Sequence, residues 1–167
     1  MYVRSLIAYE YIKSFTVLGS TGELLISWLT DGKVKLWDLL TGSCIYNIRI
    51  PGYVGTALFP LNESEFIMGD EIGQLRVWKL NGYCSVEDAE EEEEEEDENV
   101  HKENKMWRRA QRLLKESSFH LECKHVVEGH KADVISIFRP TRRGLISSSW
   151  EEEIKVWIIG KLRLLLT

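Results

Sequence analysis

The sequence predicts an all-β protein of about three repeated units, each with four antiparallel strands, and a phrase that occurs three times carries this prediction. The phrase reads aliphatic, basic, aliphatic, tryptophan, and its copies span residues 34–37, 75–78 and 154–157. Trp37 and Trp78 lie 41 residues apart, and Trp78 and Trp157 lie 79 apart, which is nearly two such periods. A period near forty with one such strand in each unit is typical of radially repeated all-β folds.

Each tryptophan strand is expected to be the third strand of its unit. The first strands are short apolar segments, expected at residues 12–18, 54–60 and 134–140. The second strands are expected at 23–29, 65–68 and 144–149. The turns that follow, at 30–32, 70–73 and 150–153, are rich in acidic residues and glycine. Asp and Gly suit tight turns, since Asp bonds nearby backbone and Gly tolerates positive φ. An unmatched strand is expected at 2–8.

The fourth strands are expected at residues 44–50, 121–127 and 162–166. The second of these is delayed, because about 38 residues are inserted after Asn81-Gly82. The chain is therefore expected to divide into three parts. Residues 1–84 hold the first two units and residues 85–120 hold the insertion. Residues 121–167 hold the outer strand of the second unit and the third unit.

The insertion begins with an acidic run at residues 87–98, which holds eleven carboxylates among twelve positions. Packed carboxylates repel one another and lose hydration, so the run is expected to be disordered and solvated. It is interpreted as a spacer, as a lure for basic partners such as histone tails or ribosomal proteins, or as a cover for the basic segment after it.

Residues 102–116 predict a basic amphipathic helix, because apolar residues recur there at three- and four-residue spacing. The remaining positions include Arg108, Arg109, Arg112 and Lys115. Three interpretations are open: a lid on the edge of a unit, a partner or calmodulin-like target helix, and a nuclear import signal.

Composition indicates a soluble protein of the cytoplasm or nucleus. The formal net charge is −6, and leaving out the eleven acidic groups of the run gives +5, so nucleic acid is an unlikely partner. The three cysteines, Cys44, Cys84 and Cys123, form no CxxC pair, which suits a reducing compartment. Charged residues interrupt the apolar runs at both ends, so neither a secretory signal nor a membrane span is expected.

No catalytic, cofactor or metal site is expected. The sequence has no nucleophile elbow and no phosphate-binding glycine loop. The spacing of His120, Cys123, His125 and His130 matches no usual zinc pattern.

With these repeated tryptophan strands and turns, the chain resembles the WD40-repeat family. Glu128-Gly129-His130 is similar to the Gly-His dipeptide of that family and lies 27 residues before Trp157. The resemblance implies a β-propeller of four-stranded blades. It also implies a buried hydrogen-bonded tetrad, carried over as His130, Ser147 (or Ser149), Glu151 in place of Asp, and Trp157.

The first two units match the family in part. Ser27, Asp31 and Trp37 match the tetrad in the first unit, but no His stands at the required distance. In the second unit Trp78 matches, and Ile72 stands where the acid is expected. Propellers usually close with about four to eight blades. This chain is therefore expected to supply a partial propeller, either as a fragment of a longer one or completed by a partner.

The resemblance implies a non-enzymatic scaffold for protein–protein interaction. In the family the turn before the tryptophan strand opens on the partner-binding face, so the residues expected there are Trp150, Thr30, Glu71, Lys131 and Asp133. Of these, Trp150 is either a partner anchor or a ring packed on its own loop. Two alternatives are the substrate-recognition propeller of a ubiquitin ligase of F-box type and a nuclear assembly factor for basic cargo. A hydrolase or metal enzyme is an outside class.

Overall fold

The computed structural model describes residues 5–52, 54–82 and 119–158 of the 167-residue chain. The acidic run at 87–98, the basic helix at 102–116, Cys84 and the strand expected at 162–166 lie outside these residues. Within them the structure is all-β, as predicted, with three antiparallel sheets and no helix.

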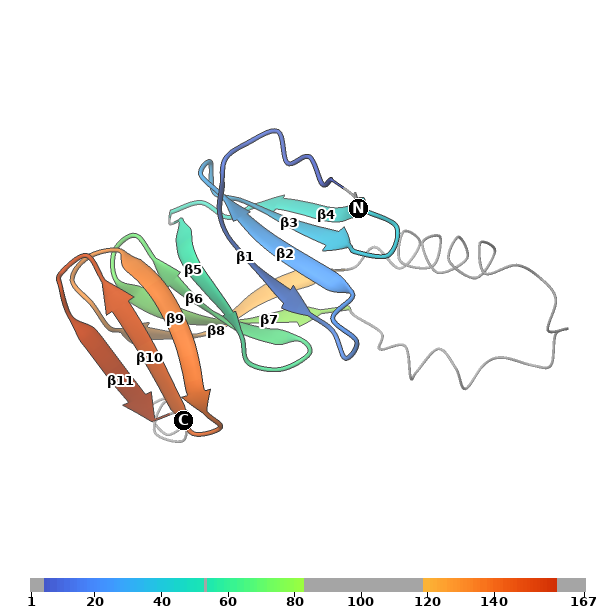
Figure 1. The fold of residues 1–167 in the computed structure, drawn as a ribbon. Helices are drawn as coiled ribbons and strands as arrows, with labels where there is room; N and C mark the ends of the chain where they lie inside the picture. The colour runs from blue at the N-terminus through green and yellow to red at the C-terminus, as the bar shows by residue number, and fades with distance from the viewer. Residues whose placement is uncertain (1–4, 53, 83–118, 159–167) are drawn as a thin grey trace, which may run out of the picture.

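The first sheet holds four strands in sequential order (Figure 1): β1 Ile12–Leu18, β2 Leu24–Leu29, β3 Lys33–Asp38 and β4 Ser43–Arg49. The second sheet holds β5 Gly55–Pro60, β6 Glu65–Asp70, β7 Gln74–Asn81 and β8 His120–Glu128. The third sheet holds, in the described residues, β9 Val134–Thr141, β10 Gly144–Ser149 and β11 Ile154–Ile158. These strands differ from those expected only at their ends.

The second sheet is completed by a strand that follows the inserted segment in sequence. β8 pairs antiparallel with β7 from Gln74↔Glu128 to Asn81↔His120. The strands on either side of residues 82–119 are therefore neighbours in one sheet, and the segment leaves and rejoins the fold at the same end of that sheet.

The sheets stand side by side like blades of a fan, with the first strands β1, β5 and β9 adjacent to one another (Figure 1). We call the face that each of the first two sheets turns to its successor its front face, and the opposite face its back face. Residues alternate between these faces along each strand, because side chains in a strand have period two. Each sheet can therefore bury apolar side chains on both faces.

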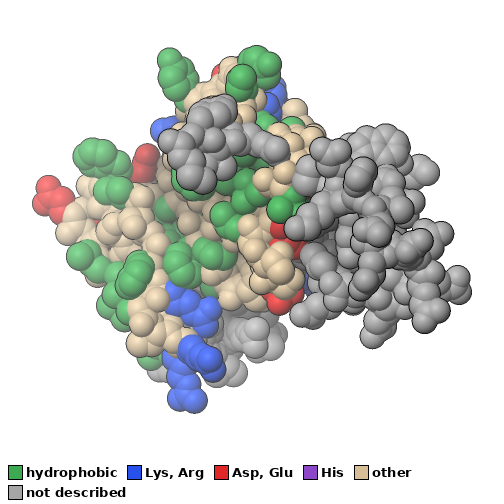
Figure 2. All heavy atoms as spheres, turned by 45° about the vertical axis from the view of Figure 1, so that its right-hand side comes forward, with side chains coloured by type: hydrophobic (Ala, Val, Ile, Leu, Met, Phe, Trp, Pro, Cys, Tyr) green, Lys and Arg blue, Asp and Glu red, His purple; other side chains and the backbone are tan. Residues whose placement is uncertain are grey.

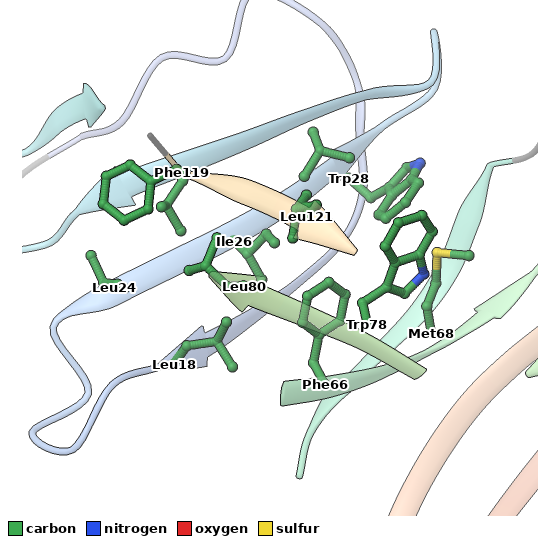
Figure 3. Packing of buried hydrophobic residues seen from close by; sticks show 12 residues of the cluster. Leu18, Leu24, Ile26, Trp28, Phe66, Met68, Trp78, Leu80, Phe119 and Leu121 are labelled. Carbon is green, nitrogen blue, oxygen red and sulfur yellow. The ribbon is translucent and has the colours of Figure 1, made fainter. Parts of the chain in front are cut away.

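The front of the first sheet packs on the back of the second through the largest core cluster. Trp28 and Trp78 meet there with ring centroids 5.7 Å apart and planes tilted by 58°. Figure 3 shows these rings side by side, with Met68 next to Trp78 and with Leu80 and Leu121 from β7 and β8. Tilted ring pairs at this separation are favourable beyond their apolar burial.

The front of the second sheet packs on the back of the third so closely that a side chain is excluded at one position. A Cβ atom placed on Gly69 would overlap the side chain of Val134. The Thr56 hydroxyl donates to the Val134 carbonyl oxygen at 2.6 Å and lies 3.1 Å from that of Gly69. Gly69 is therefore required by this contact between sheets.

The strand expected at residues 2–8 is wrong for the part that is described. Residues 5–8 form no strand, and Ala8 packs instead against Leu29 and Trp37 on the back of the first sheet. The carbonyl oxygen of Ala8 accepts a hydrogen bond from Lys35 Nζ at 2.6 Å. Tyr9 follows with φ of 64°, a left-handed conformation that turns the chain into β1.

Candidate functional site

Four side chains of the third sheet and its adjoining loops form one continuous hydrogen-bonded network, of which His130 and Ser147 are buried and Glu151 and Trp157 partly buried. Trp157 Nε1 lies 2.8 Å from Ser147 Oγ, Ser147 Oγ lies 2.7 Å from His130 Nε2, and His130 Nδ1 lies 2.5 Å from Glu151 Oε1. The indole can only donate, so the Ser147 oxygen accepts from it, and an ionised carboxylate can only accept, so His130 Nδ1–H donates to Glu151. The resemblance associated the same four residues, with Ser147 rather than Ser149 in the network.

Ser149 has a different role. Its hydroxyl donates to the Ala132 carbonyl oxygen at 2.9 Å and accepts from the Glu151 N–H at 3.3 Å, so it holds the turn rather than the network.

Two glycines allow the network to sit against the neighbouring sheet. The backbone N–H of His130 donates to the Gly73 carbonyl oxygen at 2.8 Å. A Cβ atom on Gly73 would overlap the His130 backbone, and one on Gly129 would lie 3.1 Å from the Gly73 oxygen and 3.4 Å from the Trp157 ring. The close approach of the backbone at Gly73 to the backbone at Gly129 and His130 therefore needs glycine in both segments.

Glu151 stands where the WD40 resemblance implies an Asp, and its longer side chain is held in place by bonds to Lys131 and Lys155 as well as to His130. The Lys131 N–H donates to Glu151 Oε2 at 3.0 Å, and Lys155 Nζ lies 3.2 Å from Oε1. Burial opposes ionisation of this carboxyl group, but the bonds from His130, Lys131 and Lys155 outweigh it and lower its pKa. The pKa of Lys155 is raised, since Glu151 and Glu153 outweigh the effect of burial.

The first sheet keeps only one bond of this network. Trp37 Nε1 donates to Ser27 Oγ at 2.9 Å. Asp31 is turned to Lys33, which forms an ion pair with it and lowers its pKa. Tyr9 occupies the place of His130, because Lys35 Nζ bonds the Ala8 carbonyl oxygen as Lys155 Nζ bonds that of Gly129, at 2.6 and 2.7 Å. Tyr9 is 86% exposed, whereas His130 is buried.

The second sheet replaces the network by a buried ion pair that the sequence analysis missed. Met68 stands where the other sheets have Ser27 and Ser147, opposite Arg76 in the strand register. Asp70 is fully buried, and its Oδ2 lies 2.9 Å from Arg76 Nε. Its Oδ1 accepts from the N–H groups of Ile72 and Gln74 at 3.1 and 2.8 Å. A sequence signal was present, since Arg76 is the basic residue of the repeated phrase and Asp70 stands six residues before it.

The residues expected to bind partners lie on one side of the fan. One backbone bond repeats in the three turns: Thr30 N to Tyr11 O, Glu71 N to Val54 O, and Trp150 N to Asp133 O, at 3.0 to 3.2 Å. These positions are therefore equivalent, and all three side chains are exposed, as is Lys131, while Asp133 is half-buried. We call this surface the turn face.

The turn face carries more aromatic and apolar surface than the sequence analysis assigned to it. Trp150 is 73% exposed, and Tyr9, Tyr11 and Ile72 are also large exposed side chains on this side. Figure 2 shows one side of the molecule, on which hydrophobic side chains gather in several groups and lysine and arginine side chains gather at the lower end of the view. The sequence analysis did not assign Tyr9 and Tyr11 to this face, because both lie between the strands expected at 2–8 and 12–18, outside the turns expected to form it.

The histidines and cysteines of the described residues gather at no metal site. Cys44 and Cys123 are free thiols, and His130 is held in the network described above. Among residues 5–52, 54–82 and 119–158, no group of three or more His, Cys, Asp or Glu side chains could hold a metal ion. The same residues contain no helix long and apolar enough to cross a membrane.

Comparison with known proteins shows the fold without naming a sequence family. No family model and no curated protein sequence matches the chain. Many solved chains are similar to it in three dimensions, among them one in the "Crystal Structure of Mitotic Checkpoint Complex", with a TM-score of 0.55 at 13% identity. The match covers 91% of this chain and 35% of that chain's length. The three sheets are accordingly blades of a partial β-propeller.

Proposed function

We propose that this chain is a non-enzymatic scaffold of WD40 type, which binds another protein through the turn face with Trp150 as the anchor. One observation carries this proposal: a tryptophan is 73% exposed at a position where the other two sheets have Thr30 and Glu71. The repeat does not need a large ring there. A rigid aromatic side chain on a protein surface is the type of residue that most often dominates binding energy.

The turn that carries Trp150 is held in place before any partner arrives. The backbone N–H of Trp150 donates to the Asp133 carbonyl oxygen at 3.1 Å, and the next residue, Glu151, is bonded to His130 and Lys131. Little conformational entropy is then lost when a partner binds, which favours affinity.

The surroundings of Trp150 indicate the chemistry of the partner. Glu71, Glu152 and Glu153 are exposed on the turn face, and Lys131 is the basic group beside them. The surface is therefore an apolar anchor within a mainly acidic rim. It fits a partner with an apolar pocket bordered by basic side chains, because complementary charge steers and aligns association.

The resemblance to a chain of a mitotic checkpoint complex supports a role of this fold in multiprotein assemblies. The binding partners of that chain are not assigned to the present protein, whose partner has to be found by experiment.

The proposal is tested by affinity purification with the full chain and with Trp150→Ala. We expect at least one protein to be recovered by the parent chain and about tenfold less by the variant, since loss of an anchor costs about 1–3 kcal/mol. The control is Val126→Ala, which removes a 45%-exposed side chain from β8 in the outer part of the second sheet. Equal recovery by the parent and Trp150→Ala, with both chains folded by circular dichroism, would reject the anchor.

A further inference from the structure

The front face of the third sheet differs from those of the other two sheets, although its residues are equivalent. In the first sheet Val34 and Leu36 of β3 are 0% and 1% exposed, and in the second sheet Leu75 of β7 is 0% exposed. Their counterparts on β11, Ile154 and Val156, are 71% and 72% exposed.

The strand register establishes this equivalence. Leu36 pairs with Ile26, Val77 with Ile67, and Val156 with Ile146, each one residue before the tryptophan of its strand. The first two of these pairs belong to the clusters that join neighbouring sheets. Phe138 and Ile158 extend the third row and are also exposed. The third front face therefore has the apolar side chains of a contact between sheets, and no sheet formed by residues 5–52, 54–82 and 119–158 covers them.

The back face of the first sheet is exposed on β1 at a position where the back face of the third sheet is buried on β9. Phe15 of β1 is 61% exposed, whereas its counterpart Ile137 of β9 is 8% exposed and packs against the second sheet. Both residues are identified by their partners in the register, Ser27 and Ser147. Val17, also on the back of β1, is exposed as well.

The outer part of that back face is already built like the back of the third sheet. Ala8 is bonded to Lys35 as Gly129 is bonded to Lys155, and each lies at the tryptophan of its own sheet. Among the described residues, the fan thus has an apolar front face that no sheet covers at one end, and at the other end a back face with the same build, on which Phe15 and Val17 are exposed.

We propose that these ends bind a second copy of this chain. The front of the third sheet packs on the back of the first sheet of the second copy, and the same contact forms in reverse. Two copies of three sheets make six blades, and propellers close with about four to eight. A head-to-tail contact that closes on itself gives a finite assembly. This inference goes beyond the proposed function, because it uses the ends of the fan and leaves the turn face free.

The structure favours a second copy as the occupant, because the chain itself carries both faces of the contact that already joins its own sheets twice. The contact is apolar on both sides, as Ile154, Val156 and Phe138 meet Phe15 and Val17. Stable pairs bury about 1,600 Å² in total, and here two sheet faces would be covered on each copy.

The test is the molar mass of the full chain by size exclusion with light scattering over a range of concentrations. We expect twice the chain mass for the parent. Val156→Glu and Phe15→Glu, each at an exposed position, are expected to weaken association at least 100-fold, because each places a carboxylate in an apolar contact. The control Val126→Glu makes the same change on β8 of the second sheet and should leave the mass unchanged.

Mixing the two variants separates a lost contact from a misfolded chain. In a mixed pair one contact carries both substitutions and the other carries neither, so the mixture should associate where each variant alone stays monomeric. A parent chain that is monomeric at every concentration would overturn the proposal. So would growth into ever larger species, or association that neither substitution weakens.

Discussion

The third and first sheets share a tryptophan–serine hydrogen bond and a lysine–carbonyl bond beside it, but they differ in the residues that extend the first bond. In the third sheet His130 and Glu151 extend the bond into a network, which reaches the second sheet through the Gly73 carbonyl oxygen. In the first sheet the corresponding residue, Tyr9, points into solvent, and the acid pairs with a nearby lysine. The comparison indicates that the tryptophan–serine bond belongs to the individual sheet, while the backbone N–H of His130 bonds the third sheet to the second.

The largest expected effect contrasts His130 with Tyr9. His130→Ala should lower the free energy of unfolding by about 3 kcal/mol, because Ser147 and Glu151 lose buried partners. Tyr9→Ala should change it by less than about 0.5 kcal/mol, because the ring is exposed. Urea denaturation followed by tryptophan fluorescence measures both values. Similar losses for the two variants would show that the network is no more important than the solvent-exposed ring.

The next test uses pH and the two acids. The pKa of Glu151 and that of Asp31 are both lowered on folding, so their stabilising contributions are complete above their ordinary values of 4.5 and 3.8. These contributions are lost as pH falls through the lowered values. Glu151→Gln should therefore flatten the acid limb of stability against pH, measured by thermal melting. Lys155 has a raised pKa, so its contribution is complete below its ordinary value of 10.5 and is lost at still higher pH. An acid limb unchanged by Glu151→Gln would mean that this carboxylate is not held by the network.

The smallest expected effect concerns the turns. Glu152 has φ of 64°, and Gly32 stands at the same place in the first sheet with φ of 77°. Glu152→Gly should raise the free energy of unfolding by about 0.5 kcal/mol, because relief of left-handed strain slightly exceeds the added unfolded-state entropy. Gly32→Ala should lower it by about 1 kcal/mol, since a Cβ there would also lie 3.1 Å from the Ile50 carbonyl oxygen. Chemical denaturation of the two variants tests the pair, and a loss of stability in Glu152→Gly would contradict it.

Much of the fold could be predicted from the sequence, because strand residues, turn residues and the tryptophan phrase repeat together. The residues of the network in the third sheet could also be named, but only through the resemblance to the WD40-repeat family, whose tetrad positions they match. The placement of Tyr9 could not, because a search for histidine ignores a tyrosine at its position. The Asp70–Arg76 pair was missed for a related reason: the acid ends a strand instead of occupying the turn. The strand expected at 2–8 was wrong at residues 5–8, because apolar side chains there cover Trp37 rather than pair with a neighbouring strand.

The contacts between sheets were least accessible to sequence analysis. Alternation assigns Trp28 and Val156 to a face, but it does not say whether another sheet covers that face. Only the assembled sheets show that Trp28 packs against Trp78, and that no other sheet of the described residues packs against Val156. The expectations for residues 87–98, 102–116 and 162–166 stay predictions.

The pairing of β7 with β8 across residues 82–119 has a consequence for how this protein can change. The entropic cost of closing a chain connection rises only with the logarithm of its length, by about 0.6 kcal/mol for each doubling. A hairpin turn of about four residues at this site can thus be exchanged for dozens of residues at a cost of about 2 kcal/mol, which is comparable to one or two hydrogen bonds. The connection between β7 and β8 is therefore a site that tolerates insertions, where sequence can be added, lengthened or changed while the eight strands of the first two sheets keep their pairing.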